Sequence, residues 1–321
     1  MRNGLGLVLA ASLAACGGGG QTPPGGDDVG PTPDGSDIPP DRGFVITSID
    51  VPISPGQEIT RCFFFRTPNT ELLAIKRWSS VMTPGSHHMI MFLTGNTDVG
   101  TPGTVSANDC GGASANGVPV WTYAAQTATA DMLLPSDDGT GQPLAQEIPA
   151  NTAGYFQMHY LNGTDNTIMA HVKLTAEAYE AGTAYTQTAA YVTFNGNISI
   201  APNAVGDVES QTCSTPAGTK FWLMSTHAHK QAVHTEVKDG GNVVFASDDW
   251  EHPGEALFNA PTFYSFATNK LTYSCTYNNT GDNKTRTVTT GNSAATDEMC
   301  MASGYYFPAS SPKFCYNNIV F

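Results

Sequence analysis

The chain has 321 residues, 13% of them charged, and its 28 acidic against 14 basic side chains give a formal net charge of −14. Nucleic acids and anionic membrane surfaces attract proteins through clustered lysine and arginine, so this balance argues against both as electrostatic partners. We therefore predict no nucleic-acid partner, and any membrane attachment must have a source other than charge.

The N-terminus carries Arg2, a short apolar stretch and small residues before Cys16, which is the pattern of a signal peptide over residues 1–15. The stretch is too short for a permanent membrane span. Its last letters, LAAC, also resemble the bacterial lipobox, in which the cysteine is lipidated and becomes the mature N-terminus. An ordinary signal peptide with a chance cysteine is the alternative. We expect an exported protein with lipid on Cys16, anchored in the outer membrane because Gly17 is not the aspartate associated with inner-membrane retention.

A Gly-, Pro- and Asp-rich stretch follows, with almost nothing to bury and no helical or strand period, so we assign a flexible tether to residues 16–43. The remainder is long enough for two domains of ordinary size. It contains six cysteines, and an even number in an exported chain indicates three disulfides, with fifteen pairings possible in principle. These cysteines are Cys62, Cys110, Cys213, Cys275, Cys300 and Cys315.

Short runs rich in Thr, Val, Tyr and Phe, separated by Gly, Pro, Asn and Asp, recur from residue 44 to the end, and helical periodicity is hard to find. Strands at this spacing predict β-sandwiches or barrels. The letters VKDGGNVV at residues 237–244 indicate a hairpin. We predict an all-β protein with domains at residues 44–192 and 193–321, and a candidate joint near residues 200–207.

Five of the eight histidines lie in three strand-like segments, namely His87 with His88, His159, and His227 with His229. Alternate residues on a strand face the same side, so His227 and His229 can bind one metal ion. The neighbours His87 and His88 face opposite sides of a regular strand and can share a metal only across a bulge or local twist. Each pair alone is more often structural or surface-exposed than metal-binding.

Four motifs occur in a fixed order: HHM at residues 87–89, QMHY at 157–160, THAH at 226–229 and DEMC at 297–300. In this order they resemble the copper type II ascorbate-dependent monooxygenases, the family of peptidylglycine α-hydroxylating monooxygenase and dopamine β-hydroxylase. The resemblance runs from about residue 45 to the end of the chain. It implies two tandem jelly-roll-like antiparallel β-sandwich domains, two copper ions, and ascorbate or another one-electron reductant as cosubstrate.

The resemblance assigns three histidines to an electron-transfer copper in the first domain, namely His87, His88 and His159. Gln157, two residues before His159, matches a glutamine that the family also carries. An all-nitrogen site of this kind can cycle between Cu(II) and Cu(I) without binding substrate. The remaining histidines, His171, His234 and His252, have no partner in the sequence, and we interpret them as structural or surface residues.

A second copper site, where O2 binds and substrate is attacked, is matched by His227, His229 and Met299, which are thus the predicted catalytic residues. A thioether is a soft ligand that favours Cu(I), although methionine most often fills a core. The resemblance also implies the pairing of the six cysteines. The implied disulfides are Cys62–Cys110, Cys213–Cys315 and Cys275–Cys300.

Three polar anchors of the peptide-amidating members are missing. Their arginine, which grips the substrate carboxylate, is replaced by Ser225, and their asparagine and tyrosine are replaced by Met301 and Ser303. A peptide that ends in glycine is therefore not the expected substrate. We expect Ser225, Met301 and Ser303 to line a more apolar substrate pocket.

We interpret the chain as a monomeric, lipid-anchored dicopper monooxygenase that hydroxylates a C–H bond of a small organic substrate with O2. One alternative is a copper-binding or copper-storage lipoprotein that keeps the ligands without catalysis, because fold and ligands alone do not fix function. Another is a surface module without metal, which would leave six matching ligand positions to coincidence.

Overall fold

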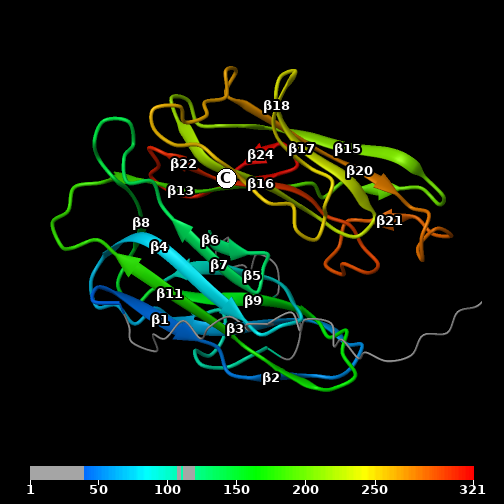
Figure 1. Ribbon diagram of the computed structural model, residues 1–321, viewed down its shortest axis with the longest axis horizontal. Coiled ribbons are helices and arrows are strands. Elements are labelled where there is room, and N and C mark those ends of the chain that lie inside the picture. The colour runs from blue at the N-terminus through cyan, green and yellow to red at the C-terminus, as the bar shows by residue number, and fades with distance from the viewer. Residues whose placement is uncertain (1–39, 107–109, 111–119) are drawn as a thin grey trace, which may run out of the picture. The chain divides into compact units, whose positions relative to one another are not determined.

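Every regular element in the part of the chain that the structure describes is a β-strand (Figure 1). The structure is a computed structural model that describes residues 40–106, 110 and 120–321, with the backbone only for His87. The predicted signal peptide, Cys16 and nearly all of the tether lie outside these residues. The described residues contain no helix, and so none that is long and apolar enough to cross a membrane.

The first half of the described chain forms two main sheets, with strand orders β1-β11-β4-β8-β12, where β7 also pairs with β4, and β3-β9-β5-β6. Their strands pair antiparallel except for β12, which pairs with β8 in parallel. A short β10-β2 pair stands apart. The strands are β1 (Gly43–Thr47), β2 (Val51–Ile53), β3 (Glu58–Arg66), β4 (Leu73–Met82), β5 (Ser86–Gly95), β6 (Val120–Ala125), β7 (Thr129–Leu133), β8 (Leu144–Ile148), β9 (Ala153–Leu161), β10 (Ile168–Ala170), β11 (Val172–Ala178) and β12 (Thr186–Gln187).

The second half repeats this plan with sheets of order β19-β16-β22-β13-β23-β24 and β15-β20-β17-β18, and a short β14-β21 pair. Its strands are β13 (Ala189–Phe194), β14 (Ser199–Ile200), β15 (Val205–Ser214), β16 (Lys220–Ala228), β17 (Ala232–Asp239), β18 (Asn242–Ser247), β19 (Ala256–Leu257), β20 (Lys270–Asn278), β21 (Val288–Thr289), β22 (Cys300–Phe307), β23 (Lys313–Tyr316) and β24 (Ile319–Val320). The all-β class and the β-sandwich architecture predicted from the sequence are confirmed.

The sandwiches form because many strands alternate buried and accessible residues, as β11 does along its whole length. In the first sandwich, Phe44 and Trp78 from one sheet share a buried cluster with Phe63 and Phe156 from the other. The hairpin expected at residues 237–244 is present as β17–β18, and Gly240 takes the positive φ of 59° that its turn requires.

The chain passes from the first set of sheets to the second close to Thr188, between β12, which pairs with β8, and β13, which pairs with β22 and β23. Figure 1 labels β13 beside β22. The division expected between residues 192 and 193 thus falls inside β13. The cluster of the first sandwich also continues into the second through Leu223, Met301 and Tyr305, so an apolar contact joins the two sandwiches.

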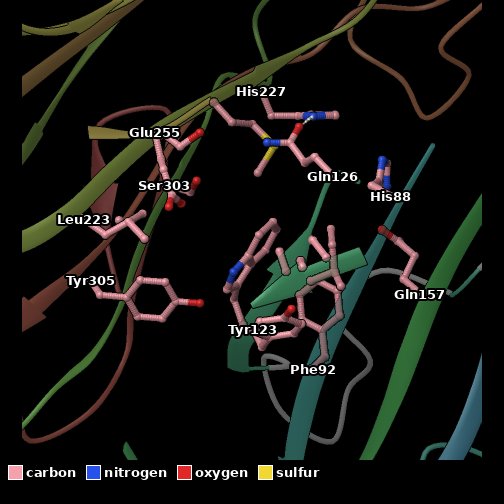
Figure 2. Close-up of a pocket in the computed structure, with 18 of the residues that line it drawn as sticks. His88, Phe92, Tyr123, Gln126, Gln157, Leu223, His227, Glu255, Ser303 and Tyr305 are labelled. Atoms are coloured by element: carbon pink, nitrogen blue, oxygen red, sulfur yellow. Dashed lines mark hydrogen bonds between the residues drawn. The ribbon is translucent and has the colours of Figure 1, made fainter. Parts of the chain in front are cut away.

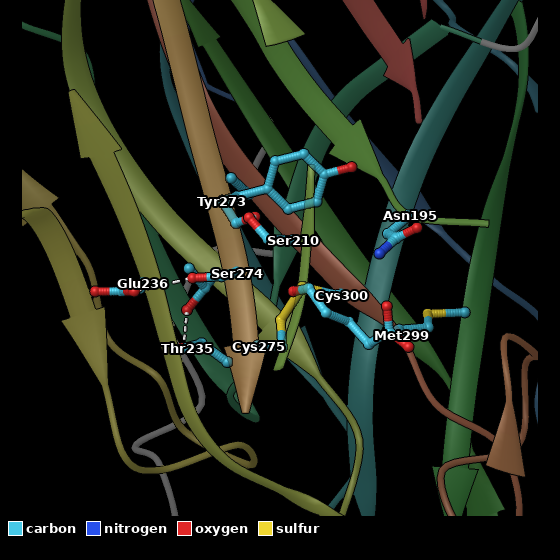
Figure 3. The surroundings of a disulfide bond; sticks show 12 residues. Asn195, Ser210, Thr235, Glu236, Tyr273, Ser274, Cys275, Met299 and Cys300 are labelled. Carbon is cyan, nitrogen blue, oxygen red and sulfur yellow. Dashed lines mark hydrogen bonds between the residues drawn. A yellow bond between two sulfur atoms is a disulfide. The ribbon is translucent and has the colours of Figure 1, made fainter. Parts of the chain in front are cut away.

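The structure contains three disulfides, and they join the cysteines that the resemblance paired. Cys62–Cys110 lies in the first sandwich, and Cys213–Cys315 links β15 to β23 in the second. Cys275–Cys300 links β20 to the first residue of β22 (Figure 3). This last bond matters for the site because Met299 immediately precedes it.

Candidate functional site

A β-bulge lies at the adjacent histidines of the first sandwich. On β5, Ser86 pairs with Tyr160 and His88 pairs with His159, so His87 is the extra residue between two consecutive pairs. From the sequence we expected such a bulge if His87 and His88 were to bind the same metal ion. His88 and His159 are buried, and their ring centroids lie 5.0 Å apart. The side chain of His87 lies outside the described part.

The second histidine pair lies at the end of β16, where the ring centroids of His227 and His229 are 5.5 Å apart. Nδ1–H of His229 donates a hydrogen bond to the backbone carbonyl of Asp297 (3.1 Å), and Nδ1–H of His227 donates to Oε1 of Gln126 (2.8 Å). Because both rings use Nδ1 in this way, Nε2 is the nitrogen by which each would bind a metal ion.

Glu298 ties Met299 to the second histidine pair. Its fully buried carboxylate accepts hydrogen bonds from the backbone N–H groups of Gln231 (2.7 Å), His229 (3.0 Å) and Met299 (3.3 Å). Burial raises the pKa of Glu298 to about 8, although these three N–H groups act in the opposite direction. Figure 3 shows Met299 next to the Cys275–Cys300 bond, which fixes the following strand.

Residues of both sandwiches meet at these histidines. The rings of His88 and His227 are 5.2 Å apart between centroids, although they belong to different sandwiches. Gln126, in the loop between β6 and β7, reaches across with the hydrogen bond to His227 (Figure 2) and also donates to the carbonyl of Thr226 (3.4 Å). The first sandwich therefore orients a ring of the second.

Glu58, the first residue of β3, makes a second link of this kind. Oε1 of Glu58 accepts from Nε2–H of His159 (2.8 Å) and from the backbone N–H of Ala294 (3.1 Å), and Oε2 accepts from Ser293 (3.4 Å). The hydrogen bond from His159 is the main cause that lowers the pKa of Glu58. A metal ion could bind Nε2 of His159 only if this hydrogen bond were given up.

Alternate residues of adjacent strands build the walls of a cavity of about 760 Å³ between the sandwiches. The register of β16 with β22 places three pairs side by side along one wall, namely Leu223 with Tyr305, Ser225 with Ser303 and His227 with Met301. Across from them lie alternate residues of β5, β6 and β9, namely His88, Ile90, Phe92, Trp121, Tyr123, Tyr155 and Gln157 (Figure 2).

The structure thus brings most of the predicted site residues to one cavity. His88, His227, Met299 and Gln157 line it, and so do the three positions Ser225, Met301 and Ser303 that were expected in a substrate pocket. His159 and His229 do not line the cavity and are buried behind it.

Of the other histidines, His171 and His234 hydrogen-bond to Asp50 and Asp248, as expected of structural or surface residues. His252 is exposed, but unlike the other two it also lines the edge of the cavity. Sequence reasoning did not identify the roles of Gln126, Glu58 and Glu298. Gln126 and Glu58 lie outside the four motifs, and Glu298 lies in DEMC, but its hydrogen bonds to His229 and Gln231 depend on the fold.

Among the described side chains, no group of three or more His, Cys, Asp and Glu residues converges in a way that could hold a metal ion. The predicted second site contains only two such residues, because its third donor is the thioether of Met299. The predicted first site includes His87, whose side chain is not described. The donors present still suit copper, since imidazole with a soft thioether favours Cu(I).

The fold and site define an all-β protein of two sandwiches with buried histidines on both sides of an apolar cavity. Residues 176–320 match the family described as copper type II ascorbate-dependent monooxygenase, C-terminal domain. The family so described depends on copper and ascorbate, and the match over this part of the chain supports the resemblance drawn from the sequence motifs.

Comparison with curated proteins gave no match. Among solved structures, the crystal structure of PBCV-1 VP54 fitted into a cryo-EM reconstruction of the virophage Sputnik has a TM-score of 0.27 and 8% identity, over 83% of this chain and 94% of that one. The crystal structure of the PBSX exported protein XepA has a TM-score of 0.23 and 8% identity, over 82% of this chain and 86% of that one. Structural similarities with such low TM-scores support no conclusion about this protein.

Replacement of Gln126 by alanine tests whether the first sandwich orients His227. We expect the copper affinity of the second site to fall about ten-fold, which is typical for loss of an outer partner of a metal-binding histidine. Competition with a Cu(I) chelator in the presence of ascorbate measures this affinity. Gln142→Ala, in an exposed loop, is the matched control. Equal affinities of Gln126→Ala and the wild type would contradict the orienting role.

Proposed function

We propose that the protein is a dicopper monooxygenase that hydroxylates a C–H bond of a small organic substrate with O2 and a reductant such as ascorbate. The observation that supports this most strongly is that members of both predicted ligand sets line one cavity, namely His88 from the first set and His227 with Met299 from the second. The rings of His88 and His227 lie 5.2 Å apart between centroids. The match of residues 176–320 to the monooxygenase domain adds independent support.

The two predicted ligand sets differ in their donor atoms, as expected if one copper transfers electrons and the other reacts with O2 and substrate. When bound, two one-electron copper centres would together supply the two electrons that hydroxylation with O2 requires. His87, His88 and His159 offer only nitrogen, which suits a centre that transfers electrons. Met299 adds the soft donor beside His227 at the cavity, where substrate has access.

The protein itself orients the ligands and supplies an apolar space beside them. Hydrogen bonds at Nδ1 hold the rings of His227 and His229, and Glu298 fixes the backbone that carries His229 and Met299. Aromatic walls leave an apolar space of a size that suits a small organic molecule. A substrate held there would lie against the wall that carries the catalytic ligands.

Copper binding or storage without catalysis is the competing function. Such a role requires the ligands but no cavity for an organic molecule. The cavity of about 760 Å³ lies within the range of small-molecule sites and is walled by side chains of both sandwiches. The cavity therefore favours catalysis over storage.

Replacement of His227 by alanine tests the paired sites. We expect two copper ions per chain in the wild type and about one in His227→Ala, because the second site loses a ligand and the first keeps all of its own. Elemental analysis of the reduced protein gives the stoichiometry. His234→Ala, a surface histidine bound to Asp248, is the control. Loss of both ions from a folded His227→Ala variant would contradict two separate sites.

Replacement of Met299 by isoleucine tests the thioether ligand. We expect the variant to keep its fold and most first-site copper, to lose turnover, and to lose the sulfur contribution from the X-ray absorption spectrum of the reduced protein. Met169→Ile, at a side chain that is 51% exposed, is the control. A sulfur contribution that persists in Met299→Ile, or activity equal to that of the wild type, would refute the assignment.

We also propose that the protein is exported, is monomeric, and is held at the outer membrane by lipid on Cys16, as the N-terminal sequence suggests. In a bacterial host fed a labelled fatty acid, we expect the label on the wild-type chain and not on Cys16→Ser. Membrane fractionation then reports where the labelled protein resides. An unlabelled wild-type chain would contradict the lipid anchor.

A further inference from the structure

A carboxylate bonds directly to a ring of the first predicted ligand set. Nε2 of His159 lies 2.8 Å from Oε1 of Glu58. An ionised carboxylate only accepts hydrogen bonds, so the ring proton is on Nε2 and Nδ1 carries the lone pair that binds a metal ion. The hydrogen bond to Glu58 and a metal ion at Nδ1 of His159 are therefore compatible.

The second sandwich holds the carboxylate of Glu58 in this position. The backbone N–H of Ala294 donates to Oε1 (3.1 Å), and the hydroxyl of Ser293 donates to Oε2 (3.4 Å). The turn that carries these donors is itself braced, because the buried side chain of Asn283 donates to the carbonyl of Ala295 (2.8 Å). The direction in which Glu58 meets the ring is thus fixed by a contact between the sandwiches.

The rings of the second ligand set donate to uncharged oxygens instead. Nδ1–H of His229 donates to the backbone carbonyl of Asp297, and Nδ1–H of His227 donates to the side-chain amide of Gln126. The carboxylate of Glu298 accepts from backbone N–H groups in this region. The two predicted ligand sets therefore differ in the charge of the groups that orient their rings.

A carboxylate bonded to a ligand ring favours the higher oxidation state of the metal. It makes the imidazole more basic, and its negative charge stabilises the ion with the larger positive charge. Water screens this charge only in part, because the side chain of His159 is 3% exposed and that of Glu58 is 22% exposed. At the second set the thioether of Met299 acts in the opposite direction, since it favours Cu(I).

Glu58 acts on the ring and is not itself placed as a ligand. Among the described side chains it does not belong to any group of three or more His, Cys, Asp and Glu residues that could hold a metal ion. Its two oxygens already accept from His159, Ala294 and Ser293. Glu58 is therefore a positioning residue.

We propose that Glu58 positions His159 and biases a copper ion at the first ligand set toward Cu(II), so that this copper is the stronger one-electron donor. This inference rests on the proposed function, because it identifies the residue that sets the driving force for electron transfer. In that transfer the first centre goes from Cu(I) to Cu(II) and the second centre gains the electron. The reductant of the proposed function then restores Cu(I) at the first centre.

Replacement of Glu58 by glutamine removes the charge and keeps an oxygen that can accept from His159 and Ala294. We expect the reduction potential of the first-site copper to rise by about 59 mV, which is a ten-fold loss of preference for Cu(II) over Cu(I) in a one-electron couple. A redox titration followed by electron paramagnetic resonance measures it. The titration uses His227→Ala as the reference protein, so that only first-site copper contributes. Glu180→Gln, at an exposed position, is the control.

Replacement of Glu58 by alanine removes the hydrogen bond as well as the charge. Nitrogen-15 NMR of the copper-free protein should find the ring proton of His159 on Nε2 in the wild type and in Glu58→Gln. In Glu58→Ala both tautomers should be populated, and the affinity of the first site for Cu(I) should fall about ten-fold relative to Glu58→Gln. Circular dichroism confirms that each variant is folded.

Two outcomes would overturn the proposal. One is a potential in Glu58→Gln that is equal to or below that of the reference protein, and the other is a ring proton on Nδ1 of His159 in the wild type. Equal potentials in an enzyme that hydroxylates a substrate would overturn this inference alone. The expected rise in a protein that binds two copper ions but hydroxylates nothing would overturn the proposed function alone.

Discussion

The buried carboxylate of Glu298 holds together the two segments that carry His229 and Met299. It accepts three backbone hydrogen bonds, from His229, Gln231 and Met299, and so joins the end of β16 to the start of β22. A buried donor left without an acceptor costs about 1–3 kcal/mol, so the arrangement persists only if all three are satisfied. Cys275–Cys300 fixes the same region covalently. The spacing between the histidines and the methionine follows from these constraints.

The apolar contact between the sandwiches explains why polar residues near it are so closely paired. Leu223, Met301 and Tyr305 of the second sandwich belong to the same buried cluster as the core of the first. A polar group buried at such a contact destabilises the folded protein unless it forms a hydrogen bond. Gln126 and Glu58 do so by bonding to His227 and to His159 with Ala294. The contacts that satisfy these groups therefore also tie the sandwiches to the histidines.

The parts of the fold that could be predicted from sequence are those with a local signal. Turn residues and alternation marked the strands, and Gly240 marked a hairpin, because these depend on neighbours along the chain. The sequence could not predict the bulge at His87 itself and showed only that a shared site for His87 and His88 would need one. A bulge depends on the register between β5 and the strand that pairs with it, which is β9. The roles of Gln126 and Glu298 come from hydrogen-bond partners far away in the sequence, which the motifs do not identify.

The alternation of β16 and β22 also sets a length scale for the cavity. On this wall His227, Ser225 and Leu223 follow one another at every second residue, and each step spans about 7 Å along a strand. Ser225 therefore lies about one step away from His227 along the strand. Ser225 and Ser303 lie on the same wall as His227 but at separate positions along their strands. Substitutions at these two serines can therefore change the shape and polarity of the cavity without moving His227.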